Sequence, residues 1–116
     1  MVPIWKSDCK YLGMRLGKSF FIDRCLPMGA ASSCAIFQRI SNALAWMTMS
    51  TSPVHYIVFN YLVDFLFLTN GHTECEISLK PFIGLCKRIG IPISTNKTIP
   101  HNTSLVFLGV GIDSTK

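Results

Sequence analysis

The sequence predicts an α+β fold in which helices pack against one face of an antiparallel sheet. Segments rich in β-branched and aromatic residues alternate with segments whose apolar residues have helical spacing, in the order ββαββαβ. No repeat, low-complexity tract or linker interrupts this order. A chain of 116 residues is one domain at most.

The composition is typical of a globular chain, since 49% of the residues are apolar and 15% are charged. Eleven Lys and Arg against six Asp and Glu give a net charge of +5, spread along the chain without a run of like charges. This excess is compatible with a polyanionic partner, but an ordinary basic surface explains it as well. The five cysteines are an odd number without a C-x-x-C pair, which indicates reduced thiols rather than structural zinc.

No segment is typical of a membrane span or a signal peptide. The most apolar stretch, residues 56–68, is short and contains Asn60 and Asp64. Lys6 and Lys10 lie in the first ten residues, and no apolar core precedes a cleavage site. We therefore expect an intracellular protein without a membrane partner, and the oligomeric state is left open.

The strands are predicted from their β-branched and aromatic content. Residues 11–16 and 19–25 form a hairpin around Gly17-Lys18. Residues 54–69 are too long for one strand, so a tight turn near Val63-Asp64 splits them into two. A last single strand is expected over residues 105–112, after a polar segment.

Two helices are predicted from capping signals and apolar spacing. Ser32 or Ser33 caps the first, whose apolar residues are Ile36, Phe37, Ile40, Leu44 and Met47. A Thr73/Glu76 capping box opens the second, whose apolar face is Ile77, Phe82, Leu85, Cys86 and Ile89, with Lys87 and Arg88 in the last turn and Gly90 after it. Because Pro81 lies inside this pattern, the second helix is either kinked or starts later, from Ser78.

Three segments, in this order along the chain, resemble motifs of reverse transcriptases. The first resembles the LPxG motif, the second the YxDD hairpin, and the third the stretch from the basic motif to the primer-grip region. They are Leu26-Pro27-Met28-Gly29-Ala30-Ala31-Ser32-Ser33 with Phe37, Tyr61-Leu62-Val63-Asp64, and Asn96-Lys97-Thr98 followed by Phe107-Leu108-Gly109. The resemblance covers nearly the whole chain.

The sequence around these motifs is similar to that of tyrosine-recombinase retrotransposons of the DIRS and Ngaro type. The segments that carry this narrower resemblance are Tyr11-Leu12-Gly13-Met14, Cys86-x-x-Ile89-Gly90-Ile91-Pro92, and Phe107-Leu108-Gly109 before Ile112-Asp113-Ser114. The resemblance implies a partial reverse transcriptase domain over residues 1–116, running from the end of the fingers–palm connection to the primer grip. It implies descent from an RNA-directed DNA polymerase that acts on a primer–template of nucleic acid.

The family resemblance also assigns roles to single residues. Pro27, Met28 and Gly29 would lie beside the incoming nucleotide and template, Tyr61 under the primer end, and Lys97 near the phosphates. Each residue also has an ordinary alternative. Gly29 is also typical of a turn glycine, and Met28 is also typical of a core methionine. Tyr61 can be an ordinary tyrosine of a sheet, and Lys97 can be an exposed loop lysine.

The metal site implied by the resemblance is incomplete. Polymerisation needs two Mg²⁺ ions about 4 Å apart, and several carboxylates must converge to hold them. Val63 stands where the family carries the first aspartate of its pair, which leaves Asp64 as a vestigial metal ligand. The third aspartate belongs to an upstream motif that this sequence does not contain, and Asp8 is expected to be a solvated loop acid. We therefore expect no bound Mg²⁺ and no polymerisation.

Two rival hypotheses remain. In the first, the chain is a working polymerase domain whose missing aspartate comes from another chain or an upstream exon. In the second, it is a non-catalytic palm that still binds nucleic acid through Lys97 and Arg88. The three histidines, His55, His72 and His101, show no ligand spacing in the sequence.

Overall fold

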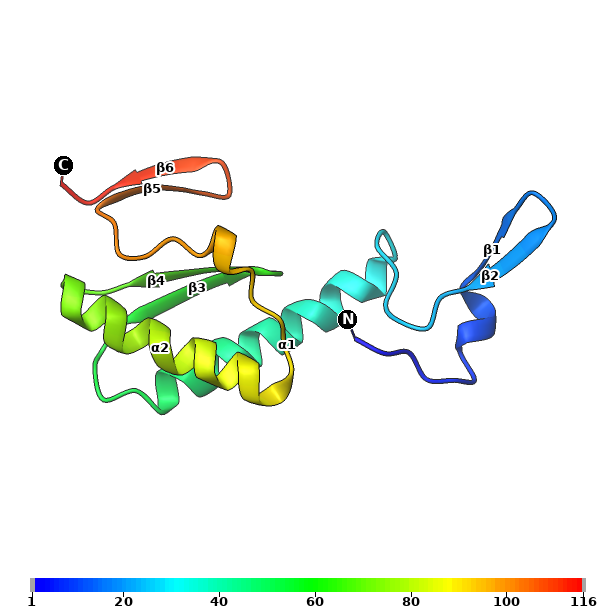
Figure 1. Ribbon diagram of the computed structural model, residues 1–116, viewed down its shortest axis with the longest axis horizontal. Helices are drawn as coiled ribbons and strands as arrows, with labels where there is room; N and C mark the ends of the chain where they lie inside the picture. Colours follow the sequence, from blue (N-terminus) through cyan, green and yellow to red (C-terminus); the bar gives the residue numbers. More distant parts are fainter. Residues whose placement is uncertain (1, 116) are drawn as a thin grey trace. The chain divides into compact units, whose positions relative to one another are not determined.

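A computed structural model describes residues 2–115 of the chain, which fall into an N-terminal unit, Met1–Ile40, and a C-terminal unit, Ser41–Lys116. Helices and antiparallel strands are both present, so the predicted α+β class is confirmed. Figure 1 shows the elements in chain order, with helix α1 belonging to both units.

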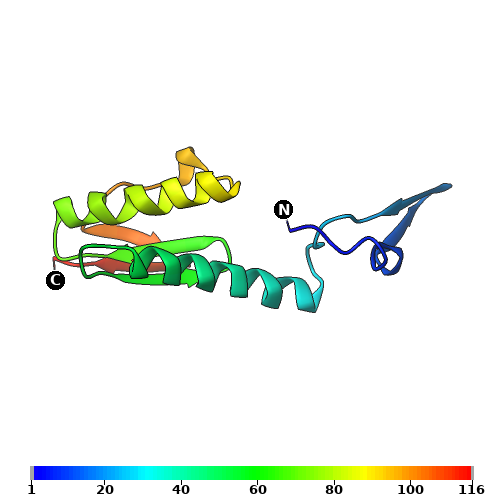
Figure 2. The same ribbon diagram turned by 90° about the horizontal axis from the view of Figure 1, so that it is seen from below.

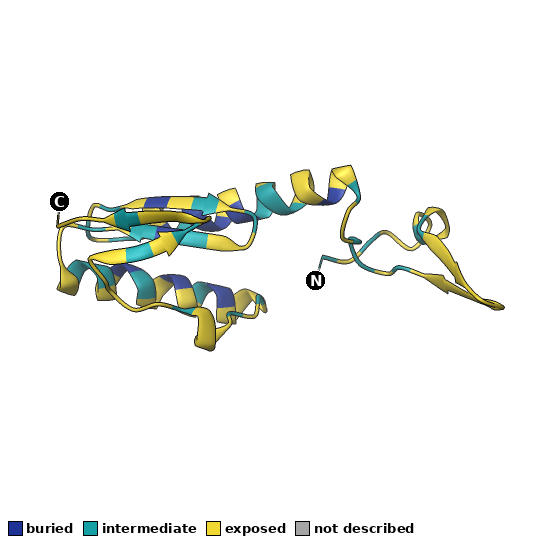
Figure 3. Cartoon of the chain, turned by 90° about the horizontal axis from the view of Figure 1, so that it is seen from above, coloured by how far each residue is buried: buried dark blue, intermediate teal, exposed yellow. Residues whose placement is uncertain are grey.

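The N-terminal unit is built around the predicted hairpin. Strands β1, Gly13–Leu16, and β2, Ser19–Ile22, pair antiparallel, and Gly17 in the turn has a φ of 61°. A short 3-10 helix, Cys9–Tyr11, precedes them, and an isolated bridge joins Pro3 to Cys25. All strand residues are exposed, and the described part of this unit contains no buried apolar side chain (Figure 3).

Helix α1 spans Ala31–Ser50. Ser32 and Ser33 lie inside its first turn, so the prediction that one of them is the N-cap is wrong. The helix instead starts shortly after the Met28-Gly29 turn, and the amide of Ser33 donates to the carbonyl of Ala30. The residues that α1 buries follow helical spacing, although Ile36 of the predicted apolar set is exposed. They are Ser33, Ser41, Leu44, Ala45 and Thr48.

The core of the C-terminal unit lies between two helices and one hairpin. Strands β3, Ile57–Tyr61, and β4, Asp64–Leu68, pair antiparallel, and α1 and α2, His72–Ile89, lie on the same face of this pair (Figures 1 and 2). Phe82 of α2 contacts the rings of Phe65 and Phe67, with centroids 4.7 and 5.2 Å apart. The buried apolar residues of this core are Leu44, Ala45, Val58, Phe82 and Cys86. Leu66 is also buried, but it alternates with Phe65 and Phe67 along β4 and therefore lies on the other face of the hairpin.

The N-terminus of α2 differs from the predicted capping box. Gly71 is the N-cap, and neither Thr73 nor Glu76 caps the helix; instead the carboxylate of Glu74 accepts from the amide of Asn70 at 3.1 Å. Gly71 has no side-chain oxygen that could accept a hydrogen bond from the first helical amides. The acid three residues after it, Glu74, instead accepts from the amide that precedes the cap.

Two starts were predicted for α2, one before Pro81 and one later, from a cap at Ser78. The structure shows the earlier start, at His72. Pro81 lies within the helix, and Ser78 is fully buried, where its hydroxyl donates to the carbonyl of Cys75 at 2.8 Å. Gly90 ends the helix as predicted, in the left-handed conformation with a φ of 78°. Ile77 and Ile89, predicted on the apolar face, are exposed, because the buried stripe follows Ser78, Phe82 and Cys86 instead.

The last element is a hairpin rather than the single strand predicted over residues 105–112. After a 3-10 helix, Thr95–Lys97, strand β5, Ser104–Phe107, pairs with β6, Val110–Asp113. Leu108 and Gly109 form the turn with φ of 51° and 81°, and positive φ at both positions matches the right-handed twist of the strands. Within residues 2–115 the strands therefore form three two-stranded sheets, where one continuous sheet was expected.

Burial also sets the chemistry of one cysteine. Cys86 is 1% exposed in the core, and removal from water raises the pKa of its thiol. Cys86 is free, as are the other four cysteines, which agrees with the prediction of reduced thiols. Among the helices of residues 2–115, none combines the length and apolar character needed to cross a bilayer.

We predict that Phe82→Ala lowers the free energy of unfolding of the C-terminal unit by about 3–5 kcal/mol, because it removes the ring that joins α2 to β4. Ile83→Ala is the matched control on the same helix, since Ile83 is 37% exposed, and it should cost about 1 kcal/mol or less. Urea denaturation followed by circular dichroism measures both. Equal destabilisation by the two substitutions would contradict this account of the core.

Candidate functional site

The candidate site is the tip of the β3–β4 hairpin, where the YxDD-like segment lies. Tyr61 and Asp64 are the last paired residues of the two strands, and Leu62 and Val63 form the turn between them. The predicted split of residues 54–69 at Val63-Asp64 is thus confirmed. Leu62 has a φ of 49°, a conformation that leucine rarely adopts, so the surrounding structure has to hold this turn in place.

Helix α1 supplies two hydrogen bonds that hold the tip. The buried hydroxyl of Ser41 donates to the carbonyl of Leu62, and the side-chain amide of Asn60 donates to that of Asn42 at 2.8 Å. The helix is therefore bonded to the strained residue itself and to the strand that leads into it. At the base of the hairpin, the hydroxyl of Tyr56 donates to the carbonyl of Thr48 at 3.0 Å, so α1 contacts the hairpin at both ends.

The chemical capacity of the tip is small. Val63 is 69% exposed and offers only an isopropyl group, while Asp64 presents one exposed carboxylate. Within residues 41–115, Asp64 has no ion-pair partner and belongs to no group of three potential metal ligands. A pair of Mg²⁺ ions needs several converging oxygen ligands, and this residue set does not provide them.

Of the other residues predicted for this site, Tyr61 lies on the same hairpin and the rest lie on separate elements. Tyr61 is 56% exposed and sits directly across from Asp64, so the hairpin does bring Tyr61, Val63 and Asp64 together. Lys97 is the exposed last residue of the second 3-10 helix, and Phe107, Leu108 and Gly109 form the end of β5 and its turn. In the part of the chain that the structure describes, no ion pair joins Lys97 to Asp64.

The LPxG-like loop belongs to the N-terminal unit and precedes α1. Pro27 lies in this irregular segment, and Gly29 has a φ of 89°, which requires glycine at this turn. Met28 is fully exposed, at 101%, so its alternative interpretation as a core methionine is wrong. Asp8 is also exposed and accepts a hydrogen bond from Ser7, in agreement with the expected solvated loop acid.

Charge and exposed rings are concentrated in the N-terminal unit. Residues 1–40 contain six Lys and Arg and two Asp and Glu, whereas residues 41–116 contain five and four. Most of the excess positive charge therefore belongs to the N-terminal unit, and it is not spread evenly along the chain as the sequence analysis indicated. Two cations lie over exposed rings, Lys10 over Tyr11 at 5.0 Å and Arg15 over Phe20 at 5.8 Å.

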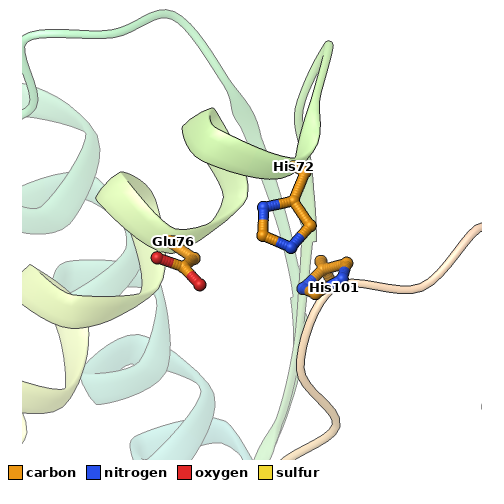
Figure 4. Close-up of side chains that lie close together, drawn as sticks. All are labelled: His72, Glu76 and His101. Carbon is orange, nitrogen blue, oxygen red and sulfur yellow. The ribbon is translucent and has the colours of Figure 1, made fainter.

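A second group of polar side chains, absent from the sequence prediction, lies at the start of α2. His72, Glu76 and His101 bring their potential ligand atoms within 4.8 Å of one another (Figure 4). The spacing of His72 and Glu76 by four residues on one helix was a signal that could have been found. His101 could not, because the loop before β5 brings it there from a distant part of the sequence.

We predict that Ser41→Ala lowers the free energy of unfolding by about 1–3 kcal/mol, because it removes a buried donor to the Leu62 carbonyl. The amides of residues 61–64 should also exchange faster with solvent. Ser50→Ala, at the exposed end of the same helix, is the control and should change neither quantity. Indistinguishable results for the two variants would show that α1 does not hold the turn.

Comparison of the sequence with protein-family models and with curated proteins finds no match in either.

Proposed function

We propose that the chain is a domain fragment of a retrotransposon reverse transcriptase that has lost its polymerase activity. The observation that best supports this is the position of Tyr61-Leu62-Val63-Asp64 across the two-residue turn of an antiparallel hairpin. A YxDD segment has to lie at such a tip to present adjacent side chains to a metal pair. The helix that follows the LPxG-like loop is the one whose Ser41 contacts this turn.

The loss of polymerase activity follows from the small number of metal-binding carboxylates that remain. In two-metal phosphoryl transfer, the ions neutralise charge on the attacking and leaving oxygens, and each ion is held by carboxylates. Asp64 alone supplies at most one such group, and Val63 supplies none. Mg²⁺ binds weakly to a single exposed carboxylate because it gives up its water ligands reluctantly. The residues of the tip therefore do not match a two-metal centre.

Restoring one carboxylate tests this assignment. We expect no template-dependent primer extension from the natural chain and none from Val63→Asp, because a two-metal centre also needs a third aspartate. Val63→Asp should nevertheless create a divalent-cation site, so that Mn²⁺ broadens the NMR signals of residues 61–65. Val63→Asn, which has the same shape without the charge, is the control and should show little broadening.

Two results would overturn the proposal. Primer extension by the natural chain that is lost in Asp64→Ala would show a working polymerase, as would activity gained by adding a separate chain that carries the missing aspartate. Absence of any Mn²⁺ effect in Val63→Asp would show that residues 63 and 64 do not point toward a common ion. The assignment of the tip as a former metal site would then be wrong.

A second candidate function is non-catalytic binding of single-stranded nucleic acid. The N-terminal unit favours it, because it combines excess positive charge with exposed aromatic rings. Tyr11 is 76% exposed and Phe20 is 77% exposed, and each has a cation beside its ring. Aromatic side chains that stack bases, with cations for the phosphates, are the usual elements of such surfaces.

The two places at which nucleic acid could bind can be compared directly. We expect the double variant Arg15→Glu/Lys18→Glu to weaken binding of a fluorescent single-stranded RNA by at least about tenfold, with a smaller salt dependence. Arg88→Glu/Lys97→Glu makes the same change of charge in the C-terminal unit and should have a smaller effect. Fluorescence anisotropy at several salt concentrations measures both, and the reverse order would place the contact near Lys97 instead.

A further inference from the structure

We propose that His72, Glu76 and His101 form a binding site for a divalent transition-metal ion of the zinc class, separate from the β3–β4 tip. Their potential ligand atoms all lie within 4.8 Å of one another, and the two imidazole rings are in contact with centroids 3.4 Å apart. Figure 4 shows ring nitrogens of both histidines and a carboxylate oxygen of Glu76 facing the same space. This inference does not depend on the proposed function.

The three side chains come from two segments that are already in contact. His72 and Glu76 lie four residues apart on the first turns of α2, so both project from one side of the helix. His101 lies in the loop between Lys97 and β5. This loop lies against α2, because Pro100 and His101 line a pocket of about 250 Å³ together with Cys75, Glu76, Leu79 and Ile83.

The chemistry of the donors selects the class of metal. Two imidazole nitrogens and one carboxylate are a common protein ligand set for zinc, with a fourth position left to water. Mg²⁺ and Ca²⁺ prefer sites made of oxygen atoms alone, so the two histidines disfavour them. Ligand atoms around a tetrahedral zinc ion lie closer together than 4.8 Å. All three residues are exposed and can move inward as the ion binds.

Two local features oppose metal binding, and the effect of each is small. Lys80 forms an ion pair with Glu76 at 3.4 Å, but both side chains are exposed and such pairs are weak. The positive end of the α2 dipole lies near His72, and Glu74 in the same turn offsets it. A metal ion would join the loop before β5 to the start of α2, and thereby stabilise a connection that now depends on side-chain contacts.

The test uses the full chain, carried on a fusion partner without a polyhistidine tag, and Zn²⁺ as the probe. Competition with a chromophoric chelator should give one Zn²⁺ per chain. His101→Ala and Glu76→Gln should each weaken binding by at least about tenfold. His55→Ala removes the remaining histidine, which is exposed and outside the site, and should leave the affinity unchanged.

Cysteine is the main competing ligand, so a second measurement identifies the donor atoms. Co²⁺ in place of Zn²⁺ should give a spectrum without thiolate-to-metal charge transfer, and Zn²⁺ should slow amide exchange of residues 98–104 in the natural chain but not in His101→Ala. Undetectable binding, thiolate bands, or undiminished affinity in a His72→Ala/His101→Ala double variant would each overturn the proposal.

Discussion

The contact of Phe82 with Phe65 and Phe67 is the interaction on which the rest of the C-terminal unit depends. It joins α2 to β4 through ring centroids 4.7 and 5.2 Å apart, in a unit that buries few other large side chains. Aromatic pairs at these separations add to the stability given by burial alone. With α2 held against β4, the face of the hairpin that carries Val58 and Phe67 is covered, and α1, on the same face (Figures 1 and 2), holds the turn through Ser41.

Several elements could be predicted from the sequence because their signals are local. Gly17, Gly90 and the β-branched content of residues 54–69 are such signals, and each marks a feature that the structure contains. The β5–β6 turn was missed because Leu108-Gly109 lacks the Asn or Asp that usually precedes glycine in a two-residue turn. The caps were also misplaced, because α1 starts before Ser32 and α2 starts after Gly71, which has no side chain that could signal a cap.

At the candidate site, the sequence predicted the local backbone geometry, because this geometry depends on neighbouring residues. A turn next to Val63 and Asp64 follows from the length of the apolar stretch, and these two residue types place one carboxylate there. What the sequence could not show is how α1 reaches the turn, because the bond from Ser41 to Leu62 joins segments 21 residues apart. The juxtaposition of His101 with His72 has the same origin, since it depends on the path of a loop without regular structure.

The division of the strands into three separate pairs has a consequence for how copies of this chain meet. In a two-stranded sheet each strand has one outer side, so within residues 2–115 no strand is flanked by partners on both sides. Such sides present rows of amides and carbonyls that another chain can extend by adding a strand. On β3 the residues beside this row include Ile57 and Phe59, both more than half exposed. Main-chain pairing of this kind, reinforced by apolar side chains, is a general route by which unpaired strand edges lead to association between molecules.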